Sequence, residues 1–339
     1  VDFSQYDNDG DGELDYVYVY YAGKGEHDTG ITSLIWPQSW YMSSTNAGKF
    51  EVDGVVVDKF ATSNELQGSG KFVGIGIFVH EFSHVLGLPD LYATTYNQSA
   101  FTPGAWSVLA NGPYNNNGRT PPHYSAYELS ELGWLDLKEL DKPDDVTLSP
   151  VSENEGYRIS TDKDNEYYVF ENRQNEGWDK YIPGHGMLVW HIDYNESRWT
   201  NNLVNTNASH QCVDIVEADG KLDESTRAGD SFPGTSHVTS FTDDTTPSMI
   251  SWSGARLNKP ITDISESSDG VVTFKVMGGH RNICAPTDIK ATVVKPTSFT
   301  LAWTPSDDCD YQTVSVYTKE ANGEKVYVDG YKEKQIGLK

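Results

Sequence analysis

The most informative stretch of this 339-residue sequence is His80-Glu81-Phe82-Ser83-His84-Val85-Leu86-Gly87-Leu88-Pro89-Asp90. Its two histidines are four residues apart, so in a helix they lie on the same face, one turn from each other. Two imidazoles at this spacing can take two corners of a zinc tetrahedron, each about 2.0–2.1 Å from the metal. The stretch therefore predicts a metal-binding helix.

The residues around the two histidines complete this prediction. The apolar run 71–79 predicts a buried helix leading into the motif. Gly87 suits a left-handed helix end, and Pro89 keeps the helix from continuing. Such a turn brings Asp90 back as a third ligand and leaves one coordination position open for water. Glu81 is placed to move a proton to and from such a water. The plainer alternative is a helix with two satisfied histidines and a surface Glu-Asp pair.

Composition limits the class of protein. The chain has 25 Lys and Arg against 50 Asp and Glu, a net charge of −25, which repels nucleic acid and anionic membranes. No apolar run is long enough to span a membrane. Of the three cysteines, Cys284 and Cys309 could pair and leave Cys212 over. The first residues resemble no signal peptide and lack a starting Met, so we expect a processed form or a fragment.

An acidic loop precedes the first expected strand. Asp7, Asp9, Asp11 and Asp15 alternate with Asn and Gly, the pattern in which a tight loop offers oxygen ligands to Ca²⁺. The bidentate Glu of an EF-hand is absent, so we expect a calcium loop of another kind; the alternative is a hydrated acidic turn. The aromatic and β-branched run 16–21 follows and predicts a strand buried on both faces.

Further motifs flank the histidine helix. The run 52–58 predicts a hairpin with an Asp-Gly turn, and we expect His27 to be a surface histidine. Residues 123–134 predict an amphipathic helix ended by Gly133. In that helix Glu128 is an alternative third metal ligand, although a solvated carboxylate is the favoured interpretation.

A charged linker is expected at 136–145, and short strands separated by turns follow it, which favours a β-sandwich. His185, His191 and Asp193 allow a second metal site, but we favour a strand with satisfied polar ends. The expected strands are 146–150, 157–160, 166–172, 186–193, 213–218 and 271–276. Beyond Cys284 another alternating pattern begins.

Several motifs in the same order resemble the M6 family of secreted metallopeptidases, whose founding members are called immune inhibitor A. The resemblance runs from Asp2 to about Val276 and rests on the runs 6–15, 35–40, 80–92, 106–109, 132–135 and 183–193. It implies an α+β fold, with a metzincin-like zinc peptidase domain followed by a β-sandwich domain, and structural calcium. It also supports His80, His84 and Asp90 as zinc ligands and Glu81 as general base and acid.

The expected domains are 1–136, the catalytic domain; 137–280, the β-sandwich; and 281–339, similar to the first half of a fibronectin type III module. Two departures from the family pattern stand out. Leu109 occupies the position of a Met beneath the zinc, where Leu can fill the same apolar floor. Catalytic-domain sequence that the family carries before the calcium loop is not in this chain. Either it remains associated as an upstream fragment of the precursor, or a sheet edge is open.

The sequence thus predicts a secreted or cell-surface zinc endopeptidase that acts on protein or peptide substrates, with Zn²⁺ and Ca²⁺ as cofactors. The competing hypothesis is a catalytically silent surface adhesin or binding protein with a peptidase-derived domain. The intact set of His80, Glu81, His84 and Asp90 argues against it, because a purely structural zinc has no use for Glu81. A zinc hydrolase of non-peptide bonds is a third option, which only the family resemblance argues against.

Overall fold

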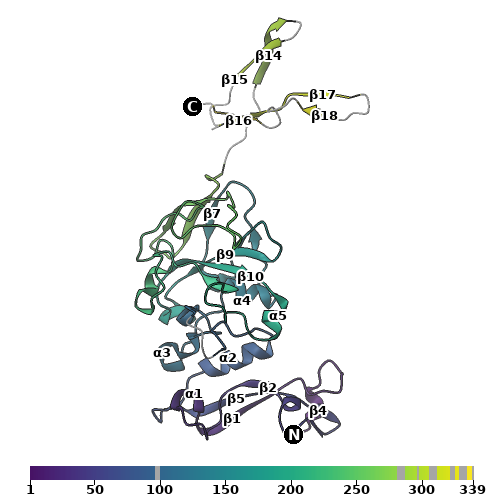
Figure 1. The fold of residues 1–339 in the computed structure, drawn as a ribbon, viewed down its shortest axis with the longest axis vertical. Helices are drawn as coiled ribbons and strands as arrows, with labels where there is room; N and C mark the ends of the chain where they lie inside the picture. The colour runs from purple at the N-terminus through teal and green to yellow at the C-terminus, as the bar shows by residue number, and fades with distance from the viewer. Residues whose placement is uncertain are drawn as a thin grey trace.

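The structure is a computed structural model that describes residues 1–95, 100–280, 287–295, 298–304, 311–320, 325–327 and 334–337. It is a mixed α and β structure, as expected (Figure 1). The finer labels, metzincin-like and β-sandwich, stay predictions. Among the described residues no helix has the length and apolar character needed to cross a bilayer. The helices are α1 (Glu26–Thr29), α2 (Gly76–Val85), α3 (Asn115–Gly118), α4 (Ala126–Glu131) and α5 (Glu196–Thr200).

The N-terminal sheet has the order β1-β5-β2, with β1 (Val17–Lys24) parallel and β2 (Ser39–Tyr41) antiparallel to the central β5 (Lys59–Leu66). The prediction that the strand at 16–21 is buried on both faces is wrong. Val19 and Tyr20 are 44% and 54% exposed, because β1 lies at the edge of this sheet. Tyr18 packs against Phe78 of α2, with ring centroids 4.7 Å apart. In Figure 1 this sheet lies below α2.

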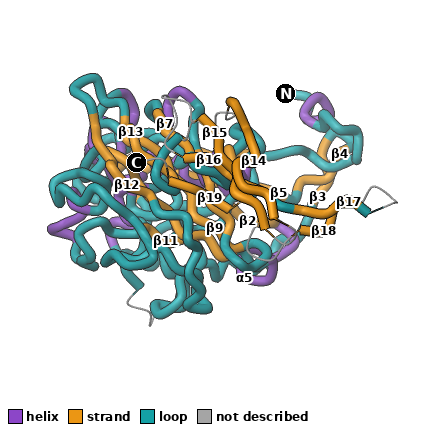
Figure 2. Tube along the Cα trace, turned by 90° about the horizontal axis from the view of Figure 1, so that it is seen from above, coloured by secondary structure: helices purple, strands orange, loops and turns teal. Residues whose placement is uncertain are grey.

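The predicted Asp-Gly hairpin is confirmed. It joins β3 (Phe50–Val52) to β4 (Val55–Val57), and both turn residues have positive φ, 50° at Asp53 and 84° at Gly54, as a type I′ turn requires. The Phe3 backbone N–H donates to Asp53 Oδ2 over 3.0 Å. The N-terminus and this hairpin therefore lie together, as the view from above also shows (Figure 2).

The histidine helix α2 is shorter than the predicted apolar run. It begins at Gly76, because the residues before it pair with the end of β5: the Val73 N–H donates to the Glu65 carbonyl over 3.0 Å, and Phe72 forms a bridge with Leu66. Its end is as predicted. Gly87 has φ 100°, and the N–H of Leu88 donates to the Ser83 carbonyl over 3.1 Å, the pattern of a Schellman turn.

Two further sheets follow. The five-stranded sheet has the order β11-β10-β9-β8-β6 and the three-stranded sheet the order β12-β13-β7. The predicted strands 157–160 and 186–193 have the observed bounds; β12 was not predicted. The bounds are β6 (Lys138–Glu139), β7 (Asp144–Leu148), β8 (Tyr157–Ser160), β9 (Glu166–Arg173), β10 (Gly186–Asp193), β11 (Val213–Ile215), β12 (Ile261–Glu266) and β13 (Val272–Val276).

The five-stranded sheet separates two apolar cores, because successive side chains of a strand point to opposite faces. On β10, Met187 and Val189 pack with the three-stranded sheet, whereas Leu188, Trp190 and Ile192 face the other way. There they share a core with residues of the histidine segment, among them Leu88, Leu91, Trp106, Val108 and Leu109. The histidine segment is thus packed directly onto this sheet, across the predicted domain boundary at 136.

The predicted charged linker 136–145 is structured, which corrects that prediction. Strand β6 and the start of β7 lie within it, and Leu140 is buried in the core between the two sheets. Near the C-terminus the described strands form the antiparallel pairs β14 (Thr287–Lys295) with β15 (Ser298–Thr304), β16 (Tyr311–Val314) with β19 (Lys334–Gly337), and β17 (Tyr317–Lys319) with β18 (Lys325–Tyr327). Cys284 and Cys309, the predicted pair, lie outside the described residues, and Cys212 is buried with a free thiol.

Candidate metal centre

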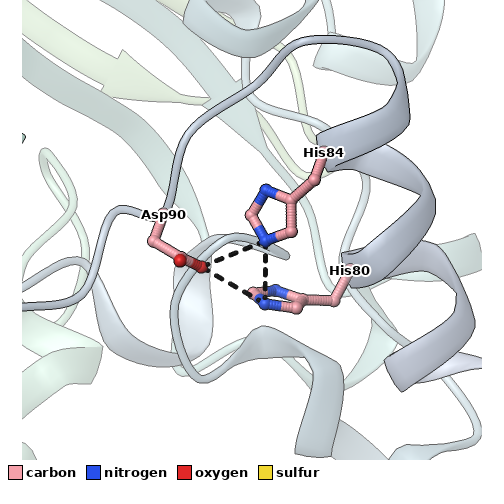
Figure 3. A group of neighbouring side chains, drawn as sticks. All are labelled: His80, His84 and Asp90. Atoms are coloured by element: carbon pink, nitrogen blue, oxygen red, sulfur yellow. Dashed lines mark hydrogen bonds and ion pairs between the residues drawn. The ribbon is translucent and has the colours of Figure 1, made fainter. Parts of the chain in front are cut away.

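The three predicted metal ligands meet at one point. His80 and His84 project from the same face of α2, and Asp90 returns from the loop after it (Figure 3). Asp90 Oδ1 lies 3.3 Å from the Nε2 atom of each histidine, and the two Nε2 atoms are 3.3 Å apart. The three donor atoms therefore form an equilateral triangle.

The size of this triangle fits a zinc ion. In a regular tetrahedron the ligand–ligand distance is about 1.63 times the metal–ligand distance, so edges of 3.3 Å correspond to a metal–ligand distance of about 2.0 Å. That value matches zinc bound to imidazole nitrogen and carboxylate oxygen, and it is shorter than calcium requires. The donor set of two nitrogens and one oxygen with a fourth corner left over is that of catalytic zinc sites.

Backbone carbonyls fix which nitrogen of each ring faces the centre. His80 Nδ1 lies 2.8 Å from the Val108 carbonyl oxygen, and His84 Nδ1 lies 2.8 Å from that of Leu88. A carbonyl can only accept, so in a neutral imidazole Nδ1 carries the proton and Nε2 presents its lone pair. Two lone pairs and a carboxylate oxygen thus converge where a cation would sit.

Asp90 is held by a residue that sequence reasoning missed. Its backbone N–H donates to Asn202 Oδ1 over 2.8 Å, and Asn202 Nδ2 donates to Asp90 Oδ2 over 2.7 Å. This leaves Oδ1, which is buried and accepts no hydrogen bond from the described residues, facing the histidines. Asn202 is 112 residues away from Asp90 in sequence, in the turn after α5, and no local sequence pattern predicts that the two residues are in contact.

The electrostatics of the centre follow from its burial and its charges. Burial alone would raise the pKa of Asp90, but its interactions with His80 and His84 outweigh this and hold that pKa well below its usual range. For His84, burial disfavours the charged ring, yet Asp90 raises the pKa to about 9. Without metal the centre therefore holds a proton, which a metal ion displaces on binding.

Glu81 lies beside the ligands and is not one of them. Its side chain lines the same cleft but does not belong to the group of converging ligand atoms. The residue is 6% exposed, and burial raises the pKa of its carboxyl, while the neighbouring histidines act in the opposite direction. A carboxylate in this environment is a better proton acceptor than one in water.

The cleft over the centre has a volume of about 640 Å³. One wall is β2, which is an edge strand of its sheet; the other walls come from α2, from Tyr114 and from the turn that carries Asn202. His27 also lines it, which corrects its interpretation as a surface histidine. Its ring is half-buried and packs against those of Trp36 and Tyr114, each with centroids 6.3 Å away.

Residues 2–135 match the family model "Immune inhibitor A peptidase M6, catalytic domain". The chain is also 27% identical to immune inhibitor A of Bacillus thuringiensis subsp. alesti over 162 residues, 41% of this chain and 23% of that protein. It is 24% identical to pre-pro-metalloprotease PrtV of Vibrio cholerae serotype O1 over 172 residues, 42% of this chain and 18% of that protein. The matches thus span less than a quarter of the length of these curated relatives. They support a metallopeptidase of the M6 type.

Within the segment that matches the family model, the turn beneath the centre is buried. Leu109 is 1% exposed, and its carbonyl oxygen accepts the Leu91 N–H over 2.8 Å. Its neighbour Val108 holds His80, and the carbonyl of Trp106 accepts a hydrogen bond from Arg173 Nη1 over 3.3 Å. This turn therefore connects the histidine helix to the five-stranded sheet.

Glu128 is neither a metal ligand nor a solvated carboxylate, which corrects both interpretations. It is fully buried and belongs to the N-terminal capping box of α4 with Ser125. Its Oε1 accepts the Ser107 hydroxyl over 2.6 Å, so it fastens α4 to the turn beneath the centre. Burial raises the pKa of Glu128 to about 7. The helix end at Gly133, with φ 69°, is as predicted.

The remaining candidates lie apart from the centre. His185, His191 and Asp193 are each paired separately, with Glu266, Glu166 and His210, so the interpretation as a strand with satisfied polar ends is confirmed. In the acidic loop, ligand oxygens of Asp7, Asp9 and Asp15 lie within 4.8 Å of one another. Asp11 is not in this group; its Oδ1 accepts the Glu13 N–H over 2.7 Å.

Proposed function

We propose that this protein is a zinc-dependent endopeptidase whose metal is held by His80, His84 and Asp90. The observation that carries the proposal is the triangle of donor atoms with 3.3 Å edges, set beside the buried carboxylate of Glu81 in an open cleft. The M6 match over residues 2–135 supports the same reaction class, and we extend to this chain the metzincin-like fold that the resemblance implies.

A zinc ion at this centre would supply Lewis-acid activation of a water molecule and of the scissile carbonyl group. Glu81 would accept a proton from the attacking water and donate it to the leaving amine. The hydrogen bonds of Val108, Leu88 and Asn202 hold the three ligands in place, so that little rearrangement is needed when the metal binds.

The substrate would be a protein or peptide in extended conformation. Among the residues that the structure describes, strand β2 pairs with β5 alone, and its residues Ser39, Trp40 and Tyr41 line the cleft. A peptide segment can add to such an edge by backbone hydrogen bonds, with its side chains directed alternately to either side. Because the cleft is open, the substrate chain can pass through it, which suits an endopeptidase.

Glu81→Gln tests the mechanism. The amide keeps the shape of the side chain but cannot accept the proton, so we expect casein cleavage to fall by about 10²–10⁴-fold. Zinc content, measured by elemental mass spectrometry, should stay unchanged. Glu153→Gln, at an exposed position away from the cleft, is the matched control. Near-full activity of Glu81→Gln would refute the mechanism. A wild-type protein that binds zinc but cleaves neither proteins nor peptides would favour the binding-protein hypothesis.

Calcium is a second proposal. We propose that Asp7, Asp9 and Asp15 bind Ca²⁺ through their grouped oxygens just before β1. The side chain of Asp11 would turn to join them when the ion binds. The side-chain amide of Asn8, which now donates to Asp15, would have to turn away. Asp15→Asn should then abolish the stabilisation of the wild-type protein by added calcium. Equal stabilisation of both proteins would contradict the proposal.

The location and partners are proposals as well. We propose that the chain acts outside the cell or at its surface, and that an upstream fragment of the same precursor adds to the outer edge of β1. In the part of the chain that the structure describes, that edge is unpaired and Val19 and Tyr20 are exposed. For residues 281–339 we propose a fibronectin type III-like fold, on the basis of the alternating sequence pattern and the observed strand pairs.

A further inference from the structure

A second cavity, of about 350 Å³, adjoins the cleft of the metal centre. The two share His27, Ile77, Pro113 and Tyr114, which line both of them. We call it the Asp28 pocket. It is lined by His27, Asp28, Gln67, Gly68, Ser69, Val73, Gly74, Ile77, Pro113, Tyr114, Asn117 and Gly118.

The pocket lies within one side chain's reach of His80 in the candidate metal centre. Ile77 precedes His80 by three residues on α2, so the two lie on the same helix face and are separated by about 4.5 Å along the axis. Tyr114 lines both cavities and so forms part of the wall that they share. A substrate bound over His80 can therefore place a neighbouring side chain in this pocket.

Close backbone contacts and a hydrogen bond hold the walls of the pocket together. A Cβ atom added to Gly74 would lie 1.8 Å from the Gly118 carbonyl oxygen, and one added to Gly76 would lie 1.9 Å from that of Pro113. The start of α2 and the loop 113–118 thus pack backbone to backbone. Two further lining residues are joined by a hydrogen bond, which Gln67 Nε2 donates to the Asn117 carbonyl over 2.8 Å. The cavity is therefore part of the folded structure and does not need a ligand to form.

The lining of the Asp28 pocket includes several apolar side chains and one acidic residue. Val73, Ile77, Pro113 and the Tyr114 ring provide the apolar surface. Asp28 is the one acidic residue of the lining. Its Oδ2 accepts the Gly68 N–H, and it forms no ion pair with any residue in the described part of the chain.

The nearby Lys24 binds the backbone of a lining residue, Gly68, and forms no ion pair with Asp28. Its ammonium group donates to the Gly68 carbonyl over 2.7 Å, and the residue does not line the pocket. A cavity with apolar side chains in its walls and an exposed carboxylate that has no ion-pair partner among the described residues suits a side chain with a long aliphatic stem and a positive end. The net charge of −25 for the whole chain would also attract cationic peptides.

We propose that the Asp28 pocket binds one side chain of the peptide substrate and selects lysine or arginine there. This inference rests on the proposed peptidase function and names the substrate class of the same site. The stem of the basic residue contacts Ile77 and Tyr114, and its charged end pairs with Asp28.

Two peptides that differ at one position provide the test. Binding of a set of peptides that carry a lysine at successive positions to Glu81→Gln first fixes that position; the matched peptides then carry lysine or norleucine there, which differ by the charged group. We expect the lysine peptide to have a kcat/KM about tenfold higher, as one charge-assisted contact allows. Asp28→Asn, which keeps an oxygen for the Gly68 N–H, should bring the ratio close to one. Glu26→Gln, on the same short helix but outside the pocket, should keep the wild-type ratio.

Binding separates this inference from the proposed function. The affinity of both peptides for Glu81→Gln, and for the same variant combined with Asp28→Asn, can be measured by calorimetry. A preference for binding the lysine peptide that disappears with Asp28→Asn supports the inference about the pocket. This holds even if the wild-type protein cleaves neither peptide, because the absence of cleavage would refute only the peptidase function. A lysine preference below about twofold, or one that survives Asp28→Asn, would overturn the inference, whether or not cleavage occurs.

Discussion

Arg173→Met should destabilise the protein strongly, because Arg173 is a fully buried cation that joins four parts of the fold. Its Nε and Nη2 donate to the two oxygens of Asp179, each over 2.7 Å, and its Nη1 donates to Glu171 over 3.1 Å. It also donates to the backbone carbonyls of Trp106 and His123, over 3.3 and 3.2 Å. The turn beneath the metal centre and the segment before α4 are thereby bound to β9.

The size of the effect follows from what the substitution leaves behind. Met fills much of the volume, but Glu171 and Asp179 become buried carboxylates without a cation, and removing one partner of a buried pair costs about 3–5 kcal/mol. Both carboxylates keep neutral donors: the Trp190 indole N–H donates to Glu171 over 2.8 Å and the His123 N–H to Asp179 over 2.8 Å. We therefore place the loss at about 3 kcal/mol, the lower end of that range.

The free energy of unfolding can be measured by urea denaturation followed by tryptophan fluorescence. Arg256→Met is the matched control: Arg256 also binds a carboxylate with two hydrogen bonds, to Asp244 over 2.7 and 2.6 Å, but its side chain is 53% exposed. An exposed pair of this kind contributes little to stability. A loss below about 1 kcal/mol for Arg173→Met, or equal losses for both variants, would refute the reasoning.

Three further predictions concern packing and titration. Gly76→Ala should lower the melting temperature although alanine favours helices, because its Cβ would lie 1.9 Å from the Pro113 carbonyl oxygen; a rise would contradict this contact. Leu109→Met, a swap of similar volume in the buried floor, should cost less than about 1.5 kcal/mol and leave casein cleavage within a fewfold of wild type; a larger loss would mean that the floor requires leucine. Burial raises the pKa of Glu217 to about 9 from its ordinary 4.5, so between these values the folded state holds the proton more tightly and stability falls as pH rises. Glu217→Gln should therefore stabilise the protein more at pH 8 than at pH 5, and a gain that does not grow with pH would contradict this burial.

Local patterns predicted the features that depend on neighbouring residues. The spacing of His80 and His84 follows from the pitch of one helix, and the left-handed turn at Gly87 then directs the chain back to Asp90. The strands at 157–160 and 186–193 were predicted with their observed bounds, because turn residues flank each run.

Features that depend on distant partners were missed. The aromatic run of β1 predicts a buried strand, but burial is decided by which strands lie beside it, and β1 lies at an edge. Asn202 reaches Asp90 across 112 residues. Strand β12, Ile261–Glu266, carries so many polar residues that only its pairing with β13 reveals it. Arg173 has its two carboxylate partners close by in sequence, but the backbone carbonyls of Trp106 and His123 that it also binds are 67 and 50 residues away.

The zinc content of the purified protein tests the central claim most directly. After dialysis against zinc-containing and then metal-free buffer, elemental mass spectrometry should find about one zinc per chain in the wild-type protein and in His27→Ala, a histidine of the same cleft outside the donor triangle. His84→Ala should hold close to none, because two ligands remain. A wild-type protein without zinc, or a His84→Ala variant that keeps a full equivalent, would contradict the account of this centre.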